Sequence, residues 1–135
     1  LFALNPNAKI VVMGDLNDDP IDPSVTKELG AKPKIEQTNP GELFNTTYAF
    51  YKKGIGTLAY QDQWNLFDQI IISYAWLNNN RETLSYWKTE IFNKDFLKQQ
   101  EGRYKGYPLR THSGGVWTNG YSDHFPCLIW VVKYK

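Results

Sequence analysis

The sequence is short of several features that would identify a protein class at once. Cys127 is the only cysteine, so no internal disulfide can form. The 15 basic residues nearly balance the 14 acidic ones, which excludes a nucleic-acid binder recognised by its positive charge alone. No apolar run approaches the roughly 20 residues that a membrane-spanning helix needs. Internal repeats, linkers and low-complexity segments are also missing from the sequence.

What the sequence does contain is enough apolar material for one globular domain. Its 135 residues leave room for a single hydrophobic core. The composition is 41% hydrophobic and 16% aromatic, which is typical of a globular chain and not of a disordered one. The chain begins with Leu1 and not with Met, and Phe2–Pro6 resembles the end of a helix that starts upstream. We therefore expect a fragment or a processed chain.

Hydrophobic patterning and turn residues predict strands mixed with short helices. Apolar residues on both faces predict strands at 9–13 and 127–134 that are covered on each side. The segment TLAYQDQWNLFDQIIIS, 57–73, predicts a β-hairpin or a strand after a tight turn, and SYWKTEIF predicts a strand near 86–92. The expected helices are one from an Asp22 N-cap and Pro23 to Gly30, one turn in YAWLNNN (74–80), and a short one in NKDFLKQQ (93–100).

The stretch VVMGDLNDDP brings acids and amides together directly after an apolar run. Asp15 and Asn17 share strand parity, so their side chains point the same way if the strand continues. Oxygen ligands of this kind suit Mg²⁺, which prefers a few carboxylates with waters and phosphate oxygens. Taken alone, however, G-D-x-N is more often a capped turn. Asp18, Asp19 and Asp22 fit a solvated turn that leads into a helix.

Asp68 stands within a β-rich run, on the strand face that also carries Leu66, Ile70 and Ile72. A carboxylate on an apolar face is costly unless something pairs with it. Nearby backbone groups at a bulge or a sheet end could satisfy it, and so could a histidine. His124, in YSDHFP before the last strand, is the candidate, because a carboxylate that orients an imidazole is a recurring catalytic arrangement.

Other residues of chemical interest have structural explanations that are at least as good. Arg110 precedes the loop that ends in S-D-H and is a candidate phosphate clamp, or an ordinary surface arginine. His112 has no acidic neighbour in the sequence and is interpreted as ordinary. Tyr60, Trp64 and Trp117 could stack a base or a sugar ring, although each residue type more often packs in a core or an interface.

An ordered set of motifs carries more weight than any one of these residues. GDLN (14–17) follows a strand, FDQIIIS (67–73) places an acid in a β run, and SDHFP (122–126) precedes the last strand. In this order the motifs resemble the endonuclease/exonuclease/phosphatase superfamily, the group of the deoxyribonucleases and abasic endonucleases. GTLAYQDQWNLFDQIIIS also looks like the form of this segment in bacterial members. The matches extend over nearly the entire chain.

The resemblance implies a role for each matching residue. Asp15 would orient or deprotonate the attacking water, and Asn17 would hold the phosphate or the metal. Asp123 would be a metal ligand, with Asp15 and Asn17 as further candidate ligands. His124 would hydrogen-bond the phosphoryl oxygen or transfer a proton, with Asp68 fixing its ring. The implied cofactor is Mg²⁺ or Mn²⁺, which would spread the charge that builds on phosphorus during in-line attack.

The same resemblance implies a fold and a missing part. Residues 1–135 correspond to the C-terminal half of a four-layer α/β (α+β) sandwich, with a mainly antiparallel or mixed β-sheet flanked by helices. The N-terminal half of such domains normally supplies a metal-binding Glu, for which the segment before Gly14 has no room. The expected partner of this chain is therefore the missing half or a second copy of itself, since an uncovered apolar sheet face favours association.

The expected activity is metal-dependent hydrolysis of a phosphoester by the full-length protein, with this fragment inactive alone. The substrate would be a nucleic acid or a phosphorylated small molecule or lipid. The alternative is a non-catalytic half-domain that serves as an interaction or binding module. The absence of the half that supplies the metal-binding Glu favours this alternative. Against it stands the intact set of candidate site residues, namely Asp15, Asn17, Asp68, Asp123 and His124.

Overall fold

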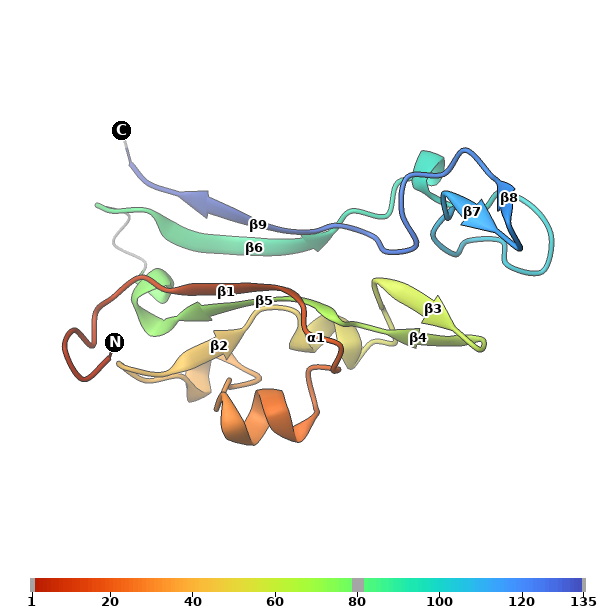
Figure 1. Cartoon of the computed structure of the whole chain (residues 1–135). Helices are drawn as coiled ribbons and strands as arrows, with labels where there is room; N and C mark the ends of the chain where they lie inside the picture. The colour runs from red at the N-terminus through yellow and green to blue at the C-terminus, as the bar shows by residue number, and fades with distance from the viewer. Residues whose placement is uncertain (1, 79–81, 135) are drawn as a thin grey trace.

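The computed structural model describes residues 2–78 and 82–134, which form small antiparallel sheets with few and short helices (Figure 1). The strands are β1 (Val11–Asp15), β2 (Leu43–Asn45), β3 (Leu58–Tyr60), β4 (Gln63–Asn65), β5 (Asp68–Ser73), β6 (Ser85–Ile91), β7 (His112–Ser113), β8 (Val116–Trp117) and β9 (Cys127–Val132). The helical segments are α1 (Tyr48–Tyr51), the π-helical turn η1 (Ser24–Glu28), and the 3₁₀ turns η2 (Ile35–Gln37), η3 (Tyr74–Leu77) and η4 (Asp95–Leu97).

β5 is the central strand of a three-stranded antiparallel sheet with the order β1-β5-β2. Its residues Ile70, Ile71 and Ile72 are all buried, although successive side chains of a strand point to opposite faces. Ile71 packs on one face in a cluster with Val25 of η1. Ile70 and Ile72 pack on the other face with Phe44 of β2. β5 is therefore covered on both sides.

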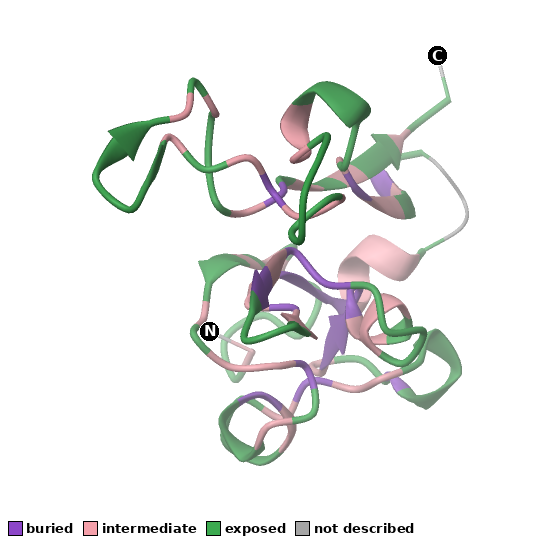
Figure 2. Ribbon diagram, turned by 90° about the vertical axis from the view of Figure 1, so that its right-hand side faces the viewer, coloured by how far each residue is buried: buried purple, intermediate pink, exposed green. Residues whose placement is uncertain are grey.

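The cover on the second face is another sheet. β6 and β9 pair antiparallel, and this pair lies over the β1-β5-β2 sheet, with η1 on the opposite side of that sheet (Figure 1). Tyr86 of β6 and Cys127 and Ile129 of β9 pack against the cluster that contains Ile70 and Ile72. The view from the side shows the buried residues gathered around β5, below the β6–β9 pair (Figure 2).

Most of the predicted segments are found near their predicted positions. The 57–73 segment forms the β3–β4 hairpin followed by β5, and the last two predicted strands are β6 and β9. The helical turn predicted in YAWLNNN is η3, although residues 79 and 80 lie outside the described residues. The helix predicted in NKDFLKQQ is reduced to the single turn η4.

Predictions for the N-terminal segment need correction. Phe2–Pro6 is not the end of a helix, because it forms turns in which the Asn5 side chain accepts the Asn7 backbone N–H at 2.9 Å. The first strand begins at Val11 and lies at the edge of its sheet. Met13 lies on the same face of the sheet as its register partner Ile70 but is 73% exposed, so the predicted cover on both faces of this strand is wrong.

The predicted helix between Asp22 and Gly30 is present but shorter. The Asp22 carbonyl accepts the Thr26 N–H at 2.9 Å at the start of η1. Its side chain does not cap the helix, because Oδ2 accepts the Asp19 N–H at 2.7 Å instead. Gly30 follows the helix with a φ of 71°, a left-handed conformation that glycine adopts without steric cost.

The β6–β9 pair is covered on only one of its two faces. Its outer face carries the exposed side chains of Trp87, Leu128 and Trp130, so the cover predicted on both sides of the last strand is also wrong. Trp87 and Trp130 pack edge to face, with ring centroids 6.4 Å apart, and Lys88 Nζ lies 5.0 Å from the centre of each ring. This face is the apolar surface on which the predicted self-association would depend.

The architecture is an α+β arrangement in which antiparallel sheets dominate. Among residues 2–78 and 82–134, no helix is long and apolar enough to span a membrane. Helical turns accompany one face of the β1-β5-β2 sheet and a second sheet covers the other (Figure 1). The four-layer sandwich and the half-domain organisation stay predictions.

Leu66 tests how much stability the packing beneath the β6–β9 pair contributes. Leu66 is fully buried with Ile91 and Phe125. We expect Leu66→Ala to lower the free energy of unfolding by about 2–5 kcal/mol, because it removes buried methyl groups and leaves a cavity. Leu4→Ala makes the same chemical change at an exposed position and should have almost no effect. Urea denaturation measures both, and similar losses for the two variants would contradict this packing.

Candidate active site

A hydrogen bond between Asp68 and His124 joins the two main sheets. Asp68 is the first residue of β5, and its Oδ2 lies 2.7 Å from Nδ1 of His124, which precedes β9. Both side chains are only 23% exposed. The predicted pairing of these two residues is confirmed as a contact, and it supplies the partner that a carboxylate on the apolar face of β5 needs. The imidazole keeps Nε2 for a second partner.

Thr57, which precedes β3, holds the backbones on both sides of this pair. Its carbonyl accepts the N–H of Phe125, the residue after His124, at 2.8 Å. Its hydroxyl lies 3.4 Å from the backbone nitrogen of Asp68. The preceding residue is Gly56, where an added Cβ would stand 2.4 Å from the carbonyl oxygen of Asn65. Because the backbone passes so close to β4 there, the position of Thr57 is fixed.

Asp15 lies beside Asp68 at the ends of neighbouring strands. The two residues are register partners in the antiparallel β1–β5 pair, and the N–H of Leu16 donates to the carbonyl of Phe67 at 2.8 Å. The Asp15 carboxylate accepts the backbone N–H of Asn17 at 2.9 Å. Asn17 has a φ of 53°, a conformation that Asn tolerates better than most residues. The G-D-x-N segment is therefore a capped turn, and this turn brings Asp15 next to the Asp68–His124 pair.

The other acids of this turn fix it to the rest of the fold. Asp19 accepts the backbone N–H of Leu66 at 2.6 Å, and Asp18 accepts the hydroxyl of Ser24 at 2.6 Å. Burial raises the pKa of Asp19, the Leu66 hydrogen bond opposes this, and the neighbouring charges of Asp22 and Asp18 add to the rise. The interpretation of these acids as a solvated turn thus needs correction, because Asp19 ties the turn to the segment before β5.

Asp123 and Arg110 form an exposed pair next to the histidine. Arg110 Nε lies 4.0 Å from Asp123 Oδ2, a loose contact that solvent screens and that a phosphate could replace. Gly120 explains how the chain reaches this position, since an added Cβ would stand 2.3 Å from the carbonyl oxygen of Arg110. The backbone of the loop before Asp123 therefore passes directly against the Arg110 backbone.

The site contains side chains with oxygen ligands, but the described residues do not form a complete coordination site for a metal ion. The residues that the structure describes contain no group of three or more His, Cys, Asp or Glu side chains placed to hold an ion. The candidate ligands Asp15, Asn17 and Asp123 are all exposed. Mg²⁺ keeps several waters and usually takes one or two carboxylates besides phosphate oxygens, and these side chains offer oxygens of that chemical kind.

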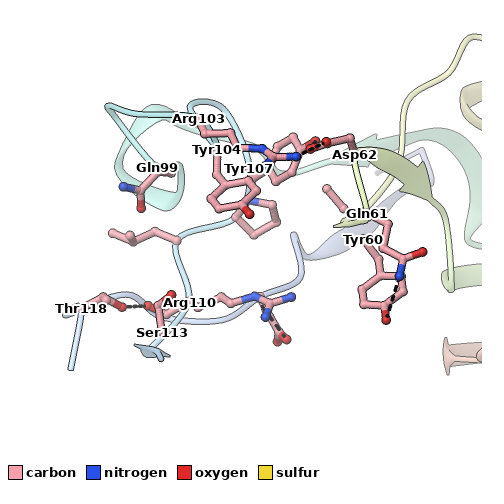
Figure 3. Close-up of a pocket in the computed structure, with 14 residues that line it drawn as sticks. Tyr60, Gln61, Asp62, Gln99, Arg103, Tyr104, Tyr107, Arg110, Ser113 and Thr118 are labelled. Atoms are coloured by element: carbon pink, nitrogen blue, oxygen red, sulfur yellow. Dashed lines mark hydrogen bonds and ion pairs between the residues drawn. The ribbon is translucent and has the colours of Figure 1, made fainter. Parts of the chain in front are cut away.

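A pocket of about 810 Å³ opens next to the site, with Arg110 and Asp123 in its wall (Figure 3). Of the three aromatic residues singled out in the sequence, Tyr60 lines this pocket, whereas Trp64 packs between Phe125 and Tyr107. Trp117 packs edge to face on His112, with ring centroids 5.0 Å apart, and lies outside the pocket.

Sequence reasoning missed several residues that build the site. Thr57 and Ser122 belong to this group, the latter because its hydroxyl accepts the backbone N–H of His124 at 3.1 Å. Cys127 also belongs, because its thiol donates to the carbonyl of Asp68 at 3.1 Å. Ser122 is the first residue of the SDHFP motif and Cys127 directly follows it, so their positions were the available signal, whereas Thr57 stands well before FDQIIIS and had no local signal.

Comparison with known proteins finds a match to a family model. A family model described as the Endonuclease/Exonuclease/phosphatase family matches residues 1–133, a range that includes every candidate site residue. No curated protein and no solved structure matches the chain.

Cys127 provides a chemical test of the packing behind the pair. Burial raises the pKa of its thiol to about 12, and the negative charge of Asp68 adds to this effect. At pH 8 the reactive thiolate would then be only about 10⁻⁴ of the total, from the difference between pH and pKa. We expect iodoacetamide to modify the native chain far more slowly than the urea-unfolded chain, as followed by mass spectrometry. Equal rates would show that the thiol is not buried against Asp68.

Proposed function

The chain belongs to the endonuclease/exonuclease/phosphatase family, and we propose that it hydrolyses phosphoesters by attack of an activated water on phosphorus. The observation that carries this proposal is the Asp68–His124 hydrogen bond at 2.7 Å, formed beside Asp15 at the ends of β1 and β5. An oriented imidazole and an exposed carboxylate at one point of the surface are groups that can act on a hydrolytic water and a phosphoryl oxygen.

His124 serves as the proton carrier at the phosphate. Because Nδ1 donates to the Asp68 carboxylate, the neutral ring presents the lone pair of Nε2, and the protonated ring presents an N–H there. The neutral ring can accept a proton, and the charged ring can donate a hydrogen bond to a phosphoryl oxygen. Asp68 keeps the ring in one orientation and stabilises its positive charge, which is the role of a carboxylate behind a catalytic imidazole.

Asp15, the last residue of β1, and Asn17, in the turn that follows β1, are the candidates to act on the water and the phosphate. The Asp15 carboxylate is exposed, and one of its oxygens accepts the Asn17 N–H, so its other oxygen remains for a water. The Asn17 side chain offers a carbonyl oxygen and an amide N–H₂ group from the same turn. We propose that Asp15 orients or deprotonates the water and that Asn17 holds the phosphate.

Asp123, Asp15 and Asn17 are the residues that would hold a divalent ion, Mg²⁺ or Mn²⁺. Such an ion supplies positive charge that stabilises the developing negative charge on the phosphoryl oxygens. Arg110 adds a second positive charge, because its loose contact with Asp123 leaves guanidinium N–H groups for phosphate. We further propose that the chain is one half of a larger domain, whose other half completes the ligand set.

A second candidate function is that of a non-catalytic interaction module. The observation in its favour is the outer face of the β6–β9 pair, where Trp87, Leu128 and Trp130 are exposed. A partner sheet or a second copy of the chain would bury this face. The two candidates differ in what they require of His124, since only hydrolysis depends on its imidazole.

The two histidines of the chain give a matched test of the proposed site. In the full-length protein we expect His124→Ala to lower kcat/KM about 10²–10⁴-fold, because the proton carrier is lost. His112→Ala removes the same side chain on β7 and should leave the rate nearly unchanged. Hydrolysis of DNA and of bis-p-nitrophenyl phosphate measures activity, and thermal melting checks the fold. A fully active His124→Ala variant would show that the site is misassigned.

Removal of metal tests the proposed cofactor. We expect EDTA to abolish hydrolysis and excess Mg²⁺ to restore it, because the proposed ion would supply much of the positive charge that stabilises the phosphoryl oxygens during attack. Asp123→Asn should raise the Mg²⁺ concentration that gives half-maximal rate, since an amide is a weaker ligand than a carboxylate. Undiminished hydrolysis in EDTA would refute the metal-dependent mechanism.

A further inference from the structure

The pocket beside Asp123 has the size of a small-molecule site. Its volume is about 810 Å³, within the range of roughly 300–1,000 Å³ typical of ligand pockets. The tip of the β3–β4 hairpin forms one wall, and the segment from Gln99 to Arg110 forms another (Figure 3). Apart from Arg110 and Asp123, the residues of these walls have no part in the proposed hydrolysis.

Exposed tyrosine rings line this pocket. Tyr60 is 61% exposed and Tyr104 is 53% exposed, so both rings leave surface that a ligand can contact. Tyr104 and Tyr107 lie together, with ring centroids 5.7 Å apart (Figure 3). Exposed rings of this kind offer flat faces for stacking a planar group.

A network of contacts holds the rings in place before any ligand binds. Arg103 Nη2 donates to Asp62 Oδ2 at 2.7 Å, and the Tyr107 hydroxyl donates to Asp62 Oδ1 at 3.2 Å. The same guanidinium lies 5.5 Å from the centre of the Tyr104 ring. Asp62 thus connects the hairpin tip to both tyrosines of the opposite wall.

The hairpin tip places one residue in an unfavourable backbone conformation. Gln61 and Asp62 have φ values of 49° and 63°, in the left-handed region that a two-residue hairpin turn needs; Asp tolerates this region, whereas Gln rarely adopts it. Retaining Gln and Asp there places their side chains in the pocket wall. Strained backbone positions of this kind are concentrated at ligand sites, where the surrounding structure holds them in place.

The pocket is connected directly to the proposed reaction site. Asp123 lines it and is followed in the chain by His124. Trp64 packs edge to face on Tyr107, at 5.3 Å between centroids, and stacks on Phe125 at 6.1 Å. Arg110 and Asp123, which the proposed function assigns to the phosphate and the metal, both line the pocket, so a phosphate held by these two residues would lie at its wall.

We propose that this pocket binds a planar ring carried by the alcohol part of the phosphoester, so that ring-bearing esters such as nucleoside phosphates are the preferred substrates. The inference rests on the proposed phosphoester hydrolysis for the reaction but on the tyrosine-lined pocket for the choice of substrate. The ring stacks on Tyr104 and Tyr107, and Gln61 and Gln99 provide the amide groups that can pair with its edge. Lipid and polyol phosphates have no π-face to stack, so the pocket gives them no advantage.

Binding is measured separately from hydrolysis in the full-length protein that carries His124→Gln. The probes are adenosine, adenosine 5′-monophosphate and glycerol 3-phosphate, titrated by isothermal calorimetry. We expect adenosine to bind without any phosphate and the nucleotide to bind more tightly than glycerol phosphate. Tyr104→Leu should weaken adenosine and nucleotide binding about 5- to 100-fold, the loss typical of one stacking ring, and leave glycerol phosphate unaffected. Trp87→Leu, an exposed ring outside the pocket, is the control.

The outcomes separate this inference from the proposed function. Ring-dependent binding that Tyr104→Leu abolishes would support the pocket even if the wild-type protein hydrolysed none of the esters. Equal binding of nucleotide and glycerol phosphate, or an unchanged affinity in Tyr104→Leu, would overturn the inference even if hydrolysis were found. Failure of adenosine to bind would overturn it as well. Circular dichroism confirms that each variant remains folded.

Discussion

The need to pair one carboxylate governs the arrangement of this chain. Asp68 begins the strand whose following isoleucines are buried on both faces, and an unpaired charge there would be costly. Its partner comes from the second sheet, because β9 packs directly on β5 and His124 precedes β9. The hydrogen bond therefore exists only if the two sheets lie face to face. The same strand β5 places Asp15 alongside through its antiparallel pairing with β1.

The sequence predicted those parts of the structure that follow from local pattern and from the cost of burying charge. The isoleucine run identified β5, and the buried position of Asp68 led to His124 as its partner. Exposure was harder to predict, because Met13 has the same local pattern as its buried register partner Ile70 but lies outside the cluster that the β6–β9 pair covers. Thr57 could not be found, since its role depends on contacts with two distant segments.

The proposed site is built on the ends of sheet strands, whereas the pocket is built on a hairpin tip and a loop. Asp15, Asp68 and His124 stand at strand ends or beside them, where the backbone is fixed by the sheets. The pocket walls come from a hairpin tip and a long loop, which the Asp62–Arg103 ion pair holds together. Trp64 packs against both regions, so the position of the pocket depends on the same core as the position of the histidine.

The tautomer of His124 tests the central claim most directly, because it reports the Asp68 contact without any substrate or metal. Long-range ¹H–¹⁵N NMR spectra of the neutral rings distinguish a proton on Nδ1 from one on Nε2. The account predicts that the neutral His124 ring carries its proton on Nδ1 and that Asp68→Asn alters this signal while the His112 signal stays the same. A His124 ring protonated on Nε2, and unaffected by Asp68→Asn, would contradict it.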